Sequence, residues 1–228
     1  DQVAKVCLGE QGIFSVMGQG SLFIDCSTIE VEQSRALHAA AMEHALVALD
    51  APVSGGVVGA SQGTLTFMVG GLPEAVNMAK PFLLCMGKTI LHTGEAGRGQ
   101  AAKQCNNMLL GITMVAVSEV FLLAESLGLS PQTLAQVVTQ SSGQCWVMSR
   151  YVPVPDVLAD VPANHGYAPG FTSDMMLKDL RLAQASAQAS GLNLPLGSMA
   201  EALYAAAHDD YGSLDFSSII KSLQSAEN

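Results

Sequence analysis

Charged residues are scarce in this chain of 228 residues, and most of those present are acidic. Only 13% of the residues are charged, and 10 Lys and Arg against 20 Asp and Glu give a formal net charge of -10 and an isoelectric point near 4.7. Nucleic acids and anionic membranes are negatively charged, and proteins that bind them usually carry a positive field. This composition does not supply one. With 49% hydrophobic residues, the chain is also too apolar for intrinsic disorder. We therefore expect a globular protein of the soluble class whose partners include neither nucleic acid nor a membrane.

Paired cysteines and clustered histidines are lacking too. The cysteines are odd in number, widely spaced and never in a C-x-x-C pair: Cys7, Cys26, Cys85, Cys105 and Cys145. This spacing argues against a disulfide framework and a thiolate zinc site, and it favours a reducing compartment. His38 and His44 are six residues apart, which does not place them on one helical face as metal ligands. We expect no metal.

No signal sequence opens the chain, which starts with Asp1 and Gln2 rather than with a basic region followed by an apolar one. The most apolar run, residues 108–124, spans 17 residues and is interrupted by Glu119. This is at or below the length needed to cross a bilayer, so the run predicts a buried helix.

The first part of the chain alternates short β-type runs with helical ones. The expected strands cover residues 21–26, 45–53, 64–71 and 88–94, and the expected helices cover 30–45 and 73–86. Such alternation is typical of an α/β sheet. The first strand reads LFI, apolar on both faces, which is typical of a strand with neighbours on each side.

β-type runs disappear after Gly99. Windows rich in Ala, Leu and Gln predict helices over 100–127, 130–140, 172–190 and 195–208. Residues 141–170 hold four prolines and show little helical periodicity, so we expect an ordered loop there. The predicted fold class is α/β followed by all-α, with a division near residue 96.

A glycine-rich turn precedes the helix that carries Lys103, Asn106 and Asn107. At positions i, i+3 and i+4, these three side chains are expected to share one face. Two amides on an otherwise apolar helix leave buried donors unsatisfied unless a polar group lies against them, and a bound polar substrate would be such a group. The alternative is a solvated first turn.

Two further runs have the character of binding sites. The strand ending at Val53 leads into Ser54, Gly55 and Gly56, whose backbone N–H groups and hydroxyl could cradle a carboxylate, although glycines also serve plain turns. The helical run over residues 171–183 carries Lys178 beside Asp179 in its middle. A lysine on a helix is also an ordinary solvated charge.

Together these runs resemble the β-hydroxyacid dehydrogenase family, and within it the 3-hydroxyisobutyrate dehydrogenases, over nearly the whole chain. DAPVSGG (50–56) resembles the family's substrate motif, GRGQAAKQCNN (97–107) its catalytic motif, and LKDLRLA (177–183) its late cofactor motif, in the same order and spacing. SSGQCW (141–146) and YVPVPDV (151–157) resemble the segment that distinguishes the hydroxyisobutyrate enzymes.

The resemblance implies oxidation of 3-hydroxyisobutyrate to methylmalonate semialdehyde with NAD, in valine breakdown. It implies Lys103 as the general acid/base, which takes the hydroxyl proton while hydride leaves the same carbon. A lysine suits this role because its pKa can be lowered by burial or by a positive neighbour, whereas arginine stays protonated. Asn107 would hydrogen-bond the substrate.

The remaining site residues are implied in the same way. Ser54, Gly55 and Gly56 would hold the substrate carboxylate. Thr28, which follows the first predicted strand, and Lys178 would contact NAD.

The chain departs from the family at its start, where the glycine fingerprint G-x-G-x-x-G and its strand-turn-helix are missing. We therefore expect a fragment, about three quarters of such an enzyme. Residues 1–96 would be the remainder of a Rossmann-type NAD-binding domain with an incomplete sheet. Residues 97–228 would be a helical domain for substrate binding and oligomerisation.

Two other functions stay open. One is oxidation or reduction of another short β-hydroxyacid, such as tartronate semialdehyde. The other is a catalytically silent fragment that only self-associates. The family's long apolar helix implies a homo-oligomer in either case, and the family's compartments are the cytoplasm in bacteria and the mitochondrial matrix in animals.

Overall fold

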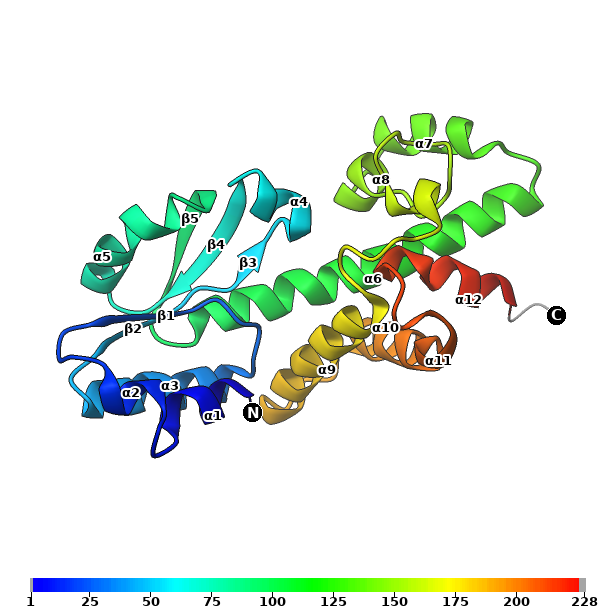
Figure 1. The fold of residues 1–228 in the computed structure, drawn as a ribbon. Coiled ribbons are helices and arrows are strands. Elements are labelled where there is room, and N and C mark those ends of the chain that lie inside the picture. Colours follow the sequence, from blue (N-terminus) through cyan, green and yellow to red (C-terminus); the bar gives the residue numbers. More distant parts are fainter. Residues whose placement is uncertain (1, 226–228) are drawn as a thin grey trace. The chain divides into compact units, whose positions relative to one another are not determined.

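The computed structural model describes residues 2–225, which form two compact units, Asp1–Cys105 and Asn106–Asn228. The strands of the described chain all lie in the first unit, and the second unit is helical (Figure 1). The predicted fold class, α/β followed by all-α, is confirmed. We expected the division near residue 96, just before a long helix. The two compact units divide between Cys105 and Asn106, inside that helix, so its first two turns belong to the sheet unit.

The sheet of the first unit is mixed. Its strands are β1 (Leu22–Asp25), β2 (Val47–Asp50), β3 (Val53–Ser54), β4 (Leu65–Gly70) and β5 (Gly87–Gly94). β1 pairs with β2 in parallel, β4 pairs with β5 in parallel, and β4 runs antiparallel to β2 and β3. Within the described residues β1 has one strand neighbour, β2, and its LFI residues are half-buried.

The single strand expected over 45–53 is divided into β2 and β3. The break falls at Ala51 and Pro52, where proline has no N–H to donate to a ladder. The break turns the chain at Asp50, so that the carboxylate of Asp50 ends a strand instead of lying inside one.

Helices cover both faces of this sheet (Figure 1). They are α1 (Gln2–Leu8), α2 (Ile13–Val16), α3 (Val31–Glu43), α4 (Gly56–Ser61) and α5 (Pro73–Leu83). One apolar core lies between the sheet and α5, around Phe67 and Leu83, and a second lies between the sheet and α1 to α3, around Phe14 and Leu37. Two apolar layers on one sheet are the arrangement expected of a doubly covered α/β domain.

The second unit is built on the long helix α6. Its helices are α6 (Arg98–Ser126), which starts in the first unit, α7 (Pro131–Thr139), α8 (Trp146–Arg150), α9 (Ser173–Ala189), α10 (Pro195–Ala206), α11 (His208–Tyr211) and α12 (Ile219–Ser225), with short 3₁₀ turns at Pro162–His165 and Phe216–Ser218. The predicted ordered loop over 141–170 contains α8 and the first of these turns. Its backbone is fixed by side chains, for example by Tyr167 Oη, which donates to Pro153 O at 2.8 Å.

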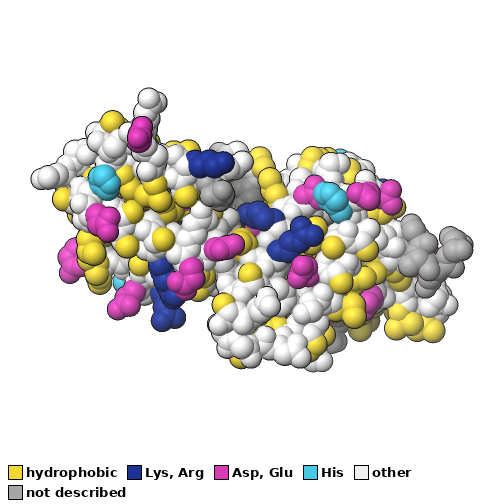
Figure 2. Space-filling view, turned by 90° about the horizontal axis from the view of Figure 1, so that it is seen from below, with side chains coloured by type: hydrophobic (Ala, Val, Ile, Leu, Met, Phe, Trp, Pro, Cys, Tyr) yellow, Lys and Arg dark blue, Asp and Glu magenta, His cyan; other side chains and the backbone are white. Residues whose placement is uncertain are grey.

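Helix α6 is long and apolar enough to cross a membrane by length and composition alone. One side of it, including Met114 and Phe121, lies in the core of the second unit. The predicted buried helix is therefore confirmed for this side, whereas Leu109 and Leu123 on another side are exposed. Acidic side chains are spread over the face drawn in Figure 2, with Lys and Arg between them rather than gathered in a broad basic patch.

Candidate active site

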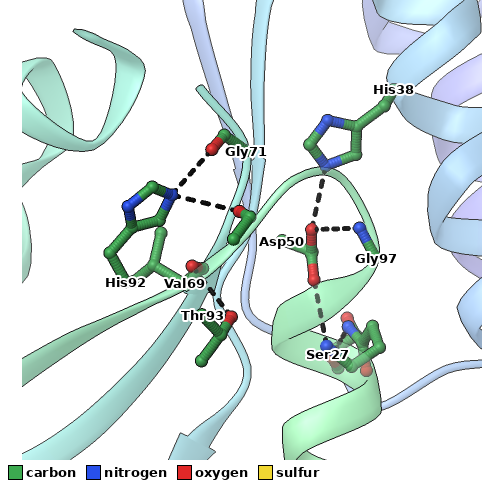
Figure 3. A network of polar contacts seen from close by, with 10 residues as sticks. Ser27, His38, Asp50, Val69, Gly71, His92, Thr93 and Gly97 are labelled. Carbon is green, nitrogen blue, oxygen red and sulfur yellow. Dashed lines mark hydrogen bonds and ion pairs between the residues drawn. The ribbon is translucent and has the colours of Figure 1, made fainter. Parts of the chain in front are cut away.

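The first turn of α6 is capped by a carboxylate from the sheet. Asp50, at the end of β2, is 1% exposed. Its Oδ1 accepts the N–H of Gly97 at 2.8 Å, and its Oδ2 accepts the N–H of Gln100 at 3.0 Å (Figure 3). Backbone N–H groups at a helix start have no partner within the helix and carry partial positive charge, so a carboxylate is favoured there.

His38 of α3 completes the surroundings of Asp50, with its Nε2 at 3.1 Å from Oδ1. Burial alone would raise the pKa of Asp50. The contact with His38 and its charge, together with the hydrogen bonds from Gly97 and Gln100, outweigh burial and hold the pKa of Asp50 below its ordinary value. Asp50 is therefore an ionised cap at neutral pH.

The next residues of α6 hold the loop that carries Thr28. Gln100 donates from Nε2 to Ser27 O at 2.8 Å and accepts from Ile29 N at 3.2 Å, while Gln104 donates to Ile29 O at 3.3 Å. Both neighbours of Thr28 are thus fixed to α6. The structure brings the Thr28 loop beside the two turns of α6 that carry Lys103.

Lys103 itself is only 8% exposed. Lysine is almost never this buried without interacting groups around its ammonium. The alternative of a solvated first turn is therefore wrong for Lys103. It is correct for Asn106, which is exposed, so only one of the two amides expected to be buried donors, that of Asn107, is buried.

Asn107, one turn after Lys103, is buried and fixed in the second unit. Its Nδ2 donates to Asp179 Oδ2 at 2.5 Å, and its Oδ1 accepts from Asn106 at 3.0 Å. Asp179 Oδ1 also lies 3.1 Å from Lys178 Nζ. The buried donor of Asn107 is therefore satisfied by a carboxylate of α9, not only by a substrate as we expected from the sequence.

Asp179 links two residues that the resemblance placed in the site, Asn107 and Lys178, and it was not itself assigned a role. A signal was present in the sequence. Asp179 lies on the same side of α9 as Met176, Leu180 and Ala183, and all of these are buried. A carboxylate on an apolar helical face is rare unless it is paired.

Ser54 ends β3, and Gly55 and Gly56 lead into α4. Their φ angles are 132° at Gly55 and 60° at Gly56, which L-residues rarely adopt. Both glycines are exposed. A short segment, Ala51 to Val53, joins these three residues to Asp50.

The end of β1 suits the nicotinamide part of a dinucleotide. Ligands of parallel sheets bind beyond the carboxyl ends of the strands, and there Cys26 and Ser27 are exposed and Thr28 is half-buried. Gln100 holds this loop on both sides of Thr28. The fit covers this end of the cofactor only, because the glycine fingerprint for the diphosphate does not occur in the sequence.

Two family models together match nearly the whole chain. Residues 1–94 match the model described as the NAD binding domain of 6-phosphogluconate dehydrogenase. Residues 97–223 match the model described as NAD-binding of NADP-dependent 3-hydroxyisobutyrate dehydrogenase. Both describe binding of a nicotinamide dinucleotide, and NAD is accordingly the cofactor of this chain.

Relatives and solved structures agree with these models. A probable 3-hydroxyisobutyrate dehydrogenase of Mycobacterium tuberculosis is 48% identical over 223 residues, which is 98% of this chain and 75% of that protein. An NAD-dependent L-serine dehydrogenase of Pseudomonas aeruginosa is 44% identical over 220 residues, 96% of this chain and 74% of that protein. The solved structure of the M. tuberculosis 3-hydroxyisobutyrate dehydrogenase with L-serine has a TM-score of 0.89 and 46% identity, and the match covers 92% of this chain and 72% of that one.

The resemblance drawn from the three sequence motifs is confirmed by matches that run from one end of the chain to the other. The chain belongs to the β-hydroxyacid dehydrogenase family of NAD-dependent oxidoreductases.

Proposed function

We propose that this protein oxidises 3-hydroxyisobutyrate to methylmalonate semialdehyde with NAD, and that Lys103 is the general acid/base. The observation that carries the proposal is the burial of Lys103 on α6, one turn before Asn107. A buried amine can exist in its neutral form, which an exposed one does not reach near neutral pH. A neutral amine is the form that can accept a proton.

The reaction removes two hydrogens from the substrate's alcohol group, a proton from the oxygen and a hydride from the carbon that carries it. The hydroxyl proton moves to Lys103 Nζ, and the oxygen's electrons form the carbonyl bond. Bound NAD supplies the acceptor for the hydride that leaves the same carbon. In the reverse direction Lys103 returns its proton to the carbonyl oxygen.

Asn107 is well prepared to orient the substrate. One of its two amide hydrogens and one of its two oxygen lone pairs are engaged by Asp179 and Asn106, which fixes the plane of the amide. The remaining hydrogen and lone pair are oriented before the substrate arrives, which lowers the entropy cost of binding. The substrate carboxylate is assigned to Ser54, Gly55 and Gly56, and Thr28 and Lys178 to NAD.

L-serine is the second candidate substrate, because one relative is named for it and one solved structure contains it. Both compounds are β-hydroxy carboxylates, and they differ at the α carbon, which carries a methyl group in one and an ammonium in the other. The runs over 141–146 and 151–157 support the methyl compound. Tartronate semialdehyde remains a third candidate. Comparing kcat/KM for the three decides: the proposal expects at least about tenfold preference for 3-hydroxyisobutyrate, since one group in a pocket is worth roughly 1–3 kcal/mol.

Lys103→Met tests the assignment of the general acid/base. We expect a loss in kcat of roughly 10²-fold or more, with the affinity for NAD unchanged, because only proton transfer is removed. Lys103→Arg should be nearly as damaging, since guanidinium stays protonated. Lys88→Met, at an exposed lysine of the same unit, is the matched control. Turnover of Lys103→Met within about threefold of the parent would overturn the assignment.

The biological setting that we propose follows from this substrate. The reaction belongs to valine catabolism, in the cytoplasm of a bacterium or the mitochondrial matrix of an animal. We propose a homo-oligomer, supported by the exposed apolar side of α6.

A further inference from the structure

Asp50 is the point at which three segments of the proposed site meet. We infer that Asp50, held by His38, is a positioning residue of the dehydrogenase, which fixes Lys103's turn of α6 and the Thr28 loop relative to each other. The inference rests on the proposed function, because it takes Lys103 and Thr28 as the residues to be positioned.

The first step concerns the two hydrogen bonds between Asp50 and the start of α6. Each carboxylate oxygen takes one backbone N–H, from Gly97 at 2.8 Å and from Gln100 at 3.0 Å. Two hydrogen bonds in different directions fix both the position of the first helical turn along the helix axis and its rotation about that axis. Lys103 follows Gln100 by three residues, so the rotation of this turn sets the direction of its side chain.

The second step is the fit around the carboxylate. A Cβ at Gly70 would lie 2.5 Å from Asp50 Oδ1, and a Cβ at Gly99 would lie 2.7 Å from Oδ2. The backbone therefore closes on the carboxylate from two sides, and Asp50 is 1% exposed. The close backbone leaves little room for a longer side chain at this position.

The third step connects Asp50 to the Thr28 loop. Gln100 gives its backbone N–H to Asp50 and uses its side chain to hold Ser27 O at 2.8 Å and Ile29 N at 3.2 Å. Gln100 thus links Asp50 to both neighbours of Thr28, so the position of Asp50 also determines the position of the Thr28 loop. A shift of Gln100 moves the Thr28 loop and α6 together.

The fourth step concerns His38, which connects the Thr28 loop back to Asp50. The Thr28 loop runs directly into α3, and α3 returns His38 to Asp50, with Nε2 at 3.1 Å from Oδ1 (Figure 3). His38 orients the oxygen that also accepts from Gly97. Figure 3 also shows His92 of β5, whose Nε2 faces the backbone oxygen of Gly71 at 2.9 Å and not Asp50. The same nitrogen lies 3.0 Å from Gly94 O.

The test is Asp50→Asn and His38→Gln in the whole chain, with His92→Gln as the matched control. An Asn at position 50 accepts one of the two N–H groups and sets its own NH₂ against the other. The first readout is labelling of Lys103 by acetic anhydride, expressed relative to exposed Lys80 and Lys88 and measured by mass spectrometry well below the unfolding midpoint. The second readout is kcat and KM with NAD and 3-hydroxyisobutyrate.

We expect relative labelling of Lys103 to change by about threefold or more in Asp50→Asn, because its turn is no longer fixed. We expect kcat to fall at least about tenfold with a much smaller change in KM, since misplacement by about 1 Å can cost 10²-fold. His38→Gln should change both in the same direction by less, and His92→Gln should change neither. A merely structural cap would lower the unfolding midpoint and leave labelling and kcat within twofold of the parent, which would overturn the inference.

Failure of the proposed function is recognised separately. If Lys103→Met kept its turnover, the acid/base assignment would fail, yet the labelling of Lys103 in Asp50→Asn would still report whether Asp50 positions it. If Asp50→Asn did not fold, His38→Gln against His92→Gln decides: equal labelling and equal kcat in these two variants would overturn the inference.

Discussion

Two buried carboxylates, Asp50 and Asp179, organise the residues around the proposed chemistry. Each takes hydrogen bonds from groups that lie far away in sequence, Gly97 and Gln100 in one case and Asn107 in the other. Buried donors and carboxylates are both costly unless they are paired, so each pair also stabilises its own unit. At the residue scale, the site is built from polar groups that satisfy one another before any ligand binds.

At Gly56 we predict that replacement by valine raises the KM for 3-hydroxyisobutyrate with little effect on NAD affinity. No atom lies within 4 Å of a Cβ placed there, so the effect comes from strain at φ 60° and not from a clash. A β-branched residue costs of order 1–3 kcal/mol in this conformation and will displace the amides assigned to the carboxylate. The measurement is steady-state kinetics beside an NAD titration.

Gly20→Val is the control for that strain. Gly20 has a φ of 78°, also with no atom within 4 Å, and lies in the turn before β1. It should lose similar stability without a change in KM. Equal activity of the parent towards the methyl ester, which lacks the anion, would contradict the carboxylate assignment.

Among the elements, α6 contributes to both units. It starts on the sheet of the first unit, and one side of it lies in the core of the second. The sequence predicted its extent well: 100–127 was expected and Arg98–Ser126 is observed. Its apolar run predicted burial. The contact of its first turn with Asp50 was not predicted, because nothing local links residues 50 and 97.

For the start of α6 we predict that Gly99→Ala lowers the free energy of unfolding by about 1–3 kcal/mol, as overpacking of a close contact does. The new methyl group would lie 2.3 Å from the backbone oxygen of Met68 and 2.7 Å from Asp50 Oδ2. Gly111→Ala in the same helix is the matched control, because its methyl group meets the flexible ends of Met176 and Leu180 at 3.0 and 3.1 Å.

Gly111→Ala also gains helix propensity of up to about 1 kcal/mol, so it should be nearly neutral. Urea unfolding of the two variants gives the comparison. Equal destabilisation of both would mean that the close contacts with Met68 O and Asp50 are not what limits residue 99.

At the scale of the whole molecule, the low pKa of Asp50 predicts how stability depends on acid. Burial raises this pKa, but the bonds from His38, Gly97 and Gln100 outweigh burial and lower it, so the folded state binds a proton less readily than the unfolded state. The stabilisation is therefore fully present above the unfolded value of about 4 and is lost as pH falls through the folded value.

Asp50→Asn removes this contribution. The stability difference between the parent and the variant should shrink as pH falls below about 4. Urea midpoints between pH 3 and pH 7 measure it. A difference that stays constant down to pH 3 would assign the effect to packing and not to the charge of Asp50.

The exposed apolar side of α6 predicts self-association. Leu109, Val120, Leu123 and Leu127 are all exposed and recur at helical spacing along one face. We predict that the protein is a homo-oligomer and that Leu123→Glu dissociates it, measured by light scattering. Leu192→Glu, at an exposed leucine after α9, should leave the mass unchanged. A monomeric parent would contradict the prediction.

The sequence by itself determined the class of fold, the order of the longer elements, which are α3, α5, α6, α7, α9, α10 and the strands apart from the division of β2 and β3, and the three motifs that identify the family. These features are local, since a periodic pattern, a glycine turn or a short motif is written in neighbouring residues. The tertiary structure alone decided that Asn106 is exposed while Lys103 and Asn107 are buried, and that β2 ends at Asp50. It also decided which carboxylate meets which donor. Asn107 and Asp179 are 72 residues apart, and Asp50 and Gly97 are 47 apart, so only the packing of the folded chain could pair them.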